Sequence, residues 1–169
     1  MGNDNTNNYN SNNYYLEGDK VKEFLRAVIL IAVMGFIYML MEIIYKGSSS
    51  PIMIAIGGLS AYFVGLLDEK NDYFYNKKMS QKCFIGMFIT LAMEFSIGMI
   101  LKHYNIILWD YSNLPCNLCG VICLPYAIMW FFLVPLGLFL NDRLRKLIFN
   151  EKEPRKPLMN YYKRLFNNH

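Results

Sequence analysis

Two long tracts that are almost free of charged residues constrain the fold of this chain more than any other feature. Together, segments 27–67 and 83–140 contain five charged side chains, which are Glu42, Lys46, Glu94, Lys102 and Asp110. The whole chain of 169 residues is 54% hydrophobic and only 18% charged, whereas soluble domains carry about 25% charged residues. Apolar tracts of this length predict helices that cross a lipid bilayer.

Turn and loop signals divide these tracts into four predicted spans. A helix needs about 20 residues to cross roughly 30 Å of hydrocarbon, and Gly47 to Pro51 reads as a turn with the proline opening the next helix. The predicted fold is therefore all-α, a polytopic membrane protein of four transmembrane helices, with a polar outer connector before the fourth. The predicted spans are about 24–45, 51–67, 83–102 and 115–140 within a transmembrane domain of residues 24–140.

The two ends of the chain differ from this domain in composition. Residues 1–23 comprise a segment rich in asparagine, which predicts disorder, and a charged lead-in to the first span. Residues 141–169 form a basic tail that Pro154 and Pro157 divide into two amphipathic pieces. We expect this cytoplasmic tail to lie on the membrane surface.

The distribution of basic residues predicts the orientation. The N-terminal segment up to Arg26, the loop 68–82 and the tail contain 15 of the 17 Lys and Arg residues, and the positive-inside rule then places both termini in the cytoplasm. The predicted location is the plasma membrane, with the lipid bilayer as the first partner. The net charge of +4 does not favour nucleic acid, because the basic residues flank apolar helices and form no stripe on a soluble domain.

Small residues recur every four positions in the second and third predicted spans, so they share one helix face. Gly57, Ala61 and Gly65 form such a face, and small residues let membrane helices approach closely. We expect this face to contact a second copy or a partner membrane subunit, because four helices make a thin bundle. In the third span Glu94 lies on the face of Gly86, Thr90 and Gly98, which predicts that the acid faces other helices and not lipid.

Five polar residues near the predicted outer side are candidates for binding a small solute or ion in an outward-facing cavity. They are Glu42, Glu94, Asp110, Asn113 and Asn117, and ionisable groups inside a membrane are costly and usually functional. Structural alternatives remain for four of them, and for Glu94 the alternative is a hydrogen bond to a neighbouring helix. Glu42 precedes Lys46 by four residues, which suits an ion pair; Asp110 lies in a sequence typical of turns; Asn117 is placed to cap a helix.

Cys116 and Cys119 form a C-x-x-C motif on the predicted outer side. Such a pair suits a membrane thiol oxidoreductase, and the alternative is that both pack as small residues. With Cys123 they do not complete the four ligands of a zinc site. No phosphate-binding loop and no hydrolase motif is present, so the sequence predicts neither an enzyme nor a cofactor, and any ATPase is a separate protein.

The segment from residue 107 to residue 130 resembles the signature of a bacterial family of small membrane proteins, the ABC-transporter type IV (CmpB-like) family. The matching residues are Ile107-Leu-Trp-Asp-Tyr-Ser-Asn-Leu-Pro115, Asn117, Gly120, Ile122-Cys-Leu-Pro125 and Trp130. Weaker matches extend the resemblance over about residues 35–150, at Met41-Glu42, Gly57-Gly58, Glu94-Phe95, Gly98, Asp142, Arg143 and Arg145.

This resemblance implies a polytopic, permease-type membrane protein. By resemblance, the functional positions are Glu42, Glu94, Asp110, Asn117 and Cys123, whereas Cys116 and Cys119 depart from the family pattern. The predicted function is a permease-like protein, in which Glu94 and Asp110 bind a cation or proton and Asn117 orients them. Two alternatives remain, a non-transporting scaffold or accessory subunit, and a thiol oxidoreductase that uses Cys116 and Cys119.

Overall fold

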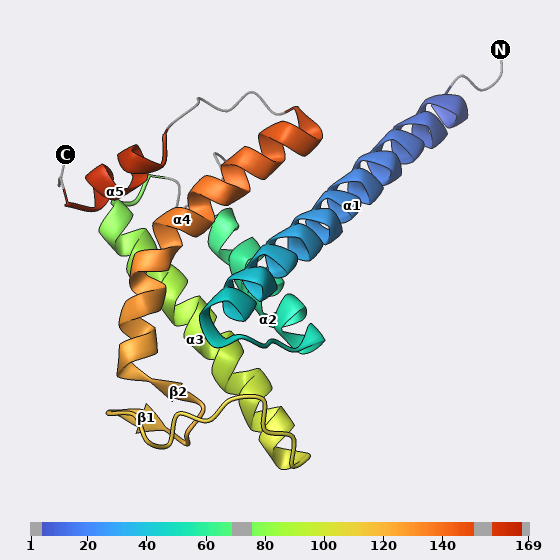
Figure 1. Cartoon of the computed structure of the whole chain (residues 1–169). Coiled ribbons are helices and arrows are strands. Elements are labelled where there is room, and N and C mark those ends of the chain that lie inside the picture. Colours follow the sequence, from blue (N-terminus) through green and yellow to red (C-terminus); the bar gives the residue numbers. More distant parts are fainter. Residues whose placement is uncertain (1–4, 69–75, 151–156, 167–169) are drawn as a thin grey trace.

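The structure, a computed structural model, describes residues 5–68, 76–150 and 157–166, with side chains from residue 20 onward except at residues 45 and 46. Its elements in chain order are α1 Asn5–Lys46, α2 Pro51–Leu66, α3 Met79–His103, β1 Asn117–Leu118, β2 Ile122–Cys123, α4 Leu124–Phe149 and α5 Leu158–Phe166. Figure 1 shows helices crossing one another, with the small hairpin of β1 and β2 at one end and α5 near the other.

Three of the described helices are long and apolar enough to cross a membrane. They are Lys20–Ile44 within α1, the whole of α3 and the whole of α4. The fourth apolar helix, α2, has 16 residues, which extend about 24 Å at about 1.5 Å per residue, less than the roughly 30 Å of hydrocarbon. The prediction of a helical membrane protein is confirmed, whereas a fourth span at residues 51–67 is not.

The segment that precedes α4 differs from the prediction of a span at 115–140. Residues 117–123 form an antiparallel two-stranded hairpin, so the fold is not purely helical, and α4 starts at Leu124 with Pro125 in its first turn. Proline suits a helix start, because its missing N–H has no partner there. The helix then continues past residue 140 to Phe149, where Asn150 ends it in a left-handed conformation at φ 52°.

The N-terminal segment also differs from the expectation of disorder. Helix α1 has 42 residues and begins at Asn5, so it runs through most of the asparagine-rich segment (Figure 1). Nucleating a helix is costly, but adding a residue to an existing helix costs little. The apolar part of α1 therefore supplies the nucleus from which the polar residues continue. Residues 1–4 lie outside the described residues.

Glycines allow α1 and α2 to pack at very short range. A Cβ atom on Gly35 of α1 would lie 2.0 Å from the Ile54 carbonyl oxygen, and a Cβ atom on Gly58 of α2 would lie 2.2 Å from the Ile31 carbonyl oxygen. Since each glycine faces the backbone of the other helix, only the absence of a side chain permits this approach. The two helices are therefore antiparallel neighbours in tight contact.

The predicted intermolecular role of the Gly57, Ala61 and Gly65 face is wrong in this structure. Gly57 contacts the Tyr38 ring of α1, and Gly65 contacts the Asn141 side chain of α4. The face is therefore covered within the chain, because α1 and α4 pack on α2. The predicted face of α3 is confirmed, since Gly86, Thr90, Glu94 and Gly98 are all buried.

The end of the bundle near α5 contains a buried ion pair. Lys82 Nζ donates to Asp68 Oδ1, and both side chains are almost fully buried. Close by, the fully buried Tyr161 of α5 packs into a cluster with Cys83 and Leu138, and its hydroxyl donates to Asp142. Lys82 is thus not a surface residue, and α5 packs on α3 and α4 instead of lying apart from them.

Candidate binding site in the helix bundle

Helix α1 brings an acid and a tyrosine to the same face, four residues apart. Glu42 is 8% exposed, and its Oε2 accepts a hydrogen bond of 2.6 Å from Ser49 Oγ in the turn before α2. The Lys46 side chain lies outside the described residues, so the alternative ion pair with Glu42 stays a prediction. Tyr38 lies one helical turn before Glu42, within electrostatic range of that carboxylate.

Glu94 of α3 lies within electrostatic range of the same tyrosine. It is 5% exposed, and its charge acts on the hydroxyl groups of both Tyr38 and Tyr111. Burial raises the pKa of Tyr111, and the negative charge of Glu94 raises it further. Glu42 and Glu94, from helices far apart in sequence, therefore share one neighbourhood around Tyr38.

Aromatic rings from α4 and the connector complete this neighbourhood. Tyr126 stacks on Tyr111 with ring centroids 4.4 Å apart, and Trp130 stacks on Tyr38 at 5.6 Å. Because Tyr126 and Trp130 are one turn apart on α4, both rings lie on the same face of that helix. We call Glu42, Glu94, Tyr38, Tyr111 and Tyr126 the carboxylate–tyrosine cluster.

Asp110 and Asn117 do not join this cluster, and serve instead to build the hairpin. Asp110 is exposed, and its Oδ1 accepts hydrogen bonds from the Ser112 hydroxyl at 2.6 Å and the Ser112 N–H at 2.9 Å. These bonds lower the pKa of Asp110. The Asp110 carboxylate thus closes a local turn, and its predicted role in binding beside the two glutamates stays a prediction.

Asn117 links the connector before the hairpin to the turn of the hairpin through its side-chain amide. Its Nδ2 donates to the carbonyl oxygens of Ser112 at 3.1 Å and Leu114 at 2.9 Å, and its Oδ1 accepts from the Gly120 N–H at 3.2 Å. It therefore caps no helix, contrary to the alternative derived from the sequence. Gly120 has φ +69°, and a Cβ there would meet Ser112 Oγ at 2.5 Å, so the turn requires glycine.

We expect Asn117→Ala to loosen the hairpin by about 1–2 kcal/mol, since three hydrogen bonds to backbone groups are lost at an exposed site. Amide hydrogen exchange should become faster over residues 104–123 while the helices keep their protection. Asn113→Ala is the matched control, because Asn113 is an exposed neighbour in the same connector. Equal exchange in the two variants would contradict this role for Asn117.

Asn113 is exposed in the connector. Of the C-x-x-C cysteines, Cys116 lies directly before the hairpin and Cys119 lies within it. Cys116 and Cys119 are exposed free thiols with φ +51° and +55°, a region that non-glycine residues rarely adopt. The redox role stays a prediction. Cys123 is buried at the start of α4, next to Tyr111. Among the described residues, no three His, Cys, Asp or Glu side chains gather as metal ligands do.

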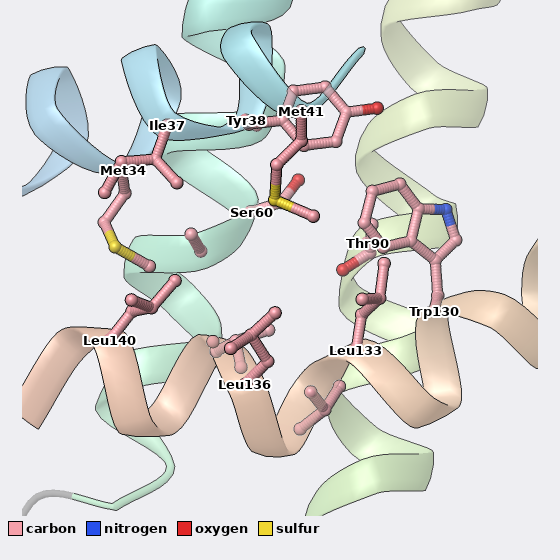
Figure 2. A pocket seen from close by; sticks show the side chains of 15 residues that line it. Met34, Ile37, Tyr38, Met41, Ser60, Thr90, Trp130, Leu133, Leu136 and Leu140 are labelled. Atoms are coloured by element: carbon pink, nitrogen blue, oxygen red, sulfur yellow. The ribbon is translucent and has the colours of Figure 1, made fainter. Parts of the chain in front are cut away.

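A cavity of about 90 Å³ adjoins the carboxylate–tyrosine cluster. Helices α1, α2, α3 and α4 all line it, with Tyr38 and Trp130 at the cluster side and aliphatic or methionine side chains of α1 and α4 facing each other elsewhere (Figure 2). None of its lining residues is charged. The stacked pair of Tyr38 and Trp130 is therefore the boundary between an apolar cavity and the two acids.

The sequence predicted both glutamates of this site but missed its aromatic residues. The spacing of Tyr38 to Glu42, and of Tyr126 to Trp130, is one helical turn, a signal that would have placed each pair on one face. Nothing in the sequence could have placed Tyr111 against Tyr126, because that contact depends on the folding of the hairpin onto α4.

Membrane-length apolar helices packed around two buried carboxylates define a polytopic helical membrane protein. Residues 20–159 match the family described as "Putative ABC-transporter type IV", and since this covers most of the chain, the protein belongs to that family. The resemblance seen in the sequence is thus confirmed. No solved structure matches the chain.

Proposed function

We propose that this protein is a permease-like component of the membrane, without enzymatic activity of its own, that binds a proton or small cation at the carboxylate–tyrosine cluster. The observation that carries the proposal is the burial of Glu42 and Glu94 from different helices around one tyrosine. Two negative charges are costly in a medium of low dielectric constant, so a cation or proton that neutralises one of them is favoured there.

We further propose four membrane crossings, with both termini in the cytoplasm and the cluster towards the outside. The concentration of 15 of 17 Lys and Arg on one side supports this orientation. The path of α2 supports the crossing, because Tyr62 near its end lies beside Glu23 and Arg26 at the start of the first span. In this arrangement α2 crosses a locally thinned bilayer, as short apolar helices do.

Transport driven by ATP would need a separate ATPase, and we propose such a subunit, together with a second copy or another membrane subunit, as partners. The family description supports an ATPase partner. An adjacent membrane subunit is consistent with the many large apolar side chains exposed on α1 and α4, among them Phe24, Phe36 and Phe132, although lipid covers such side chains equally well.

Proton flux into liposomes that contain the purified protein tests the role of the cluster. With a pH-sensitive dye inside and an imposed potassium diffusion potential, we expect the wild type to acidify the lumen and Glu94→Gln to reduce the rate at least about tenfold, because the buried acid is the proposed carrier. Glu23→Gln is the control, since Glu23 is exposed and pairs with Arg26 at 2.8 Å.

Two results would oppose the proposal and favour the alternative of a non-transporting accessory subunit. One is equal flux in wild type, Glu94→Gln and empty liposomes. The other is a lower thermal stability of Glu94→Gln with no change in flux. Either result would make Glu94 a residue that holds helices together.

A further inference from the structure

The cavity next to the carboxylate–tyrosine cluster exists because α4 bends away from α1. Pro135 lies inside α4, and proline removes a backbone hydrogen bond and crowds the preceding turn, which kinks a helix. Figure 1 shows α4 changing direction in its middle. The two helices meet on either side of this bend, where Tyr38 stacks on Trp130 and where Arg26 lies 5.4 Å over the Phe149 ring.

The wall of the cavity is apolar and adaptable. Met34, Ile37 and Met41 of α1 face Leu133, Leu136 and Leu140 of α4 (Figure 2). Methionine side chains adjust readily to the shape of a neighbour, and about 90 Å³ is more than half of the ~150 Å³ that suffices for benzene in an apolar cavity. The cavity therefore suits a compact molecule of a few non-hydrogen atoms.

Ser60 contributes a polar group to this apolar cavity. It lines the cavity from α2 and is only 4% exposed. Serine in a helix often donates to the carbonyl four residues earlier, yet within the part of the chain that the structure describes, Ser60 Oγ has no hydrogen-bond partner. A buried hydroxyl without a partner costs about 1–3 kcal/mol, so an acceptor brought by a ligand would stabilise it.

The Trp130 indole N–H is a second buried donor without a partner among the described residues. Figure 2 shows its nitrogen and the Tyr38 hydroxyl on the same side of the cavity, the side of the cluster. Hydrogen-bond donors thus occur on α2 and at the end of the cavity near the cluster, and most of the remaining lining supplies apolar contact. Thr90 is different, because its hydroxyl already donates to the Gly86 carbonyl at 3.0 Å.

We propose that this cavity binds a small, uncharged, largely apolar molecule that carries a hydrogen-bond-accepting oxygen, which Ser60 Oγ holds. The inference goes beyond the proposed function, because it adds an uncharged solute in the cavity beside the cluster that binds the proton or cation. The binding itself requires no flux, so binding and flux can fail independently.

Acetone and 2-methylpropene are the probes, because they have similar shapes, are small enough for this cavity, and only the ketone has an accepting oxygen. Equilibrium dialysis with the full chain in detergent measures binding, and Trp130 fluorescence in a Trp109→Phe background reports binding at the cavity. We expect acetone to bind with a dissociation constant on the order of 10 mM, as suits so small a ligand. The hydrocarbon 2-methylpropene should bind roughly two- to tenfold more weakly, because it lacks one hydrogen bond.

Ser60→Ala tests the named contact. It should weaken acetone binding by the same roughly two- to tenfold and leave the binding of 2-methylpropene unchanged, whereas Ser96→Ala on the exposed face of α3 should change neither. Gly137→Leu should abolish the binding of both probes, because Gly137 lines the cavity with open space beside it and the larger side chain fills that space.

Three outcomes would overturn the inference. They are non-saturable uptake of both probes, equal binding in wild type and Gly137→Leu, and an equal effect of Ser60→Ala on the two probes. If the Ser60 effect is specific to the ketone while liposomes show no proton flux, the site stands and the proposed function fails. If flux depends on Glu94 but the probes do not bind, only the solute class fails.

Discussion

Replacing Asp68 with Asn should lower the free energy of unfolding by about 3–5 kcal/mol, the expected cost of breaking a buried ion pair from one side. The Lys82 side chain is 0% exposed and the Asp68 side chain 7%, so the substitution removes a carboxylate that is buried beside the ammonium group. The measurement is unfolding of the purified protein in mixed detergent micelles with increasing dodecyl sulfate.

Two comparisons make this prediction specific. Removing both charges, with Asp68→Leu and Lys82→Met together, should restore most of the stability or exceed that of the wild type, because well-packed apolar residues replace buried ion pairs at little cost. Glu23→Gln breaks the exposed pair with Arg26 and should cost only about 0–1 kcal/mol. If Asp68→Asn costs no more than Glu23→Gln, the pair is not buried in the folded protein.

The second large effect should come from Gly58→Ala at the contact between α1 and α2. Its Cβ would lie 2.2 Å from the Ile31 carbonyl oxygen, a backbone atom that cannot rotate away, so the helices must separate. Overpacking of this kind costs about 1–3 kcal/mol and occasionally more. The same unfolding measurement applies, and Gly35→Ala, which faces the Ile54 carbonyl oxygen at 2.0 Å, should behave alike.

Gly137→Ala is the matched control for these substitutions. A Cβ at Gly137 of α4 meets only Val64 Cγ1, at the ordinary distance of 3.8 Å. Because alanine favours the helix over glycine by about 0.5–1 kcal/mol, we expect this variant to be as stable as the wild type or more stable. Equal losses in Gly58→Ala and Gly137→Ala would show that helix–helix contact is not the reason.

The role of the hairpin shows why site residues were only partly predictable. Polarity placed Asp110 and Asn117 among the candidates beside Glu42 and Glu94, since all four are polar groups next to apolar helices. In the structure, Asp110 and Asn117 form hydrogen bonds to backbone groups within residues 110–120. Turn formation is a local alternative use of Asp and Asn, and only the hairpin fold distinguishes it from solute binding.

Glu94 shows the opposite case. Its face on α3 follows from the spacing of Gly86, Thr90 and Gly98, and the structure buries those residues. A period of 3.6 residues is a property of the helix itself, so the sequence sufficed. The sequence could not predict which residues lie near Glu94 on that face, because Tyr38 and Tyr111 come from segments far apart in the chain.

The sequence alone thus determined the membrane class, the approximate helices and the inward face of α3, because hydropathy and helical period are local properties. The fold of residues 117–123, the burial of Lys82, the internal use of the Gly57 and Gly65 face and the cavity beside Tyr38 depend on which helices pack together. Such packing joins residues distant in sequence, and no local pattern records which partner each face will meet.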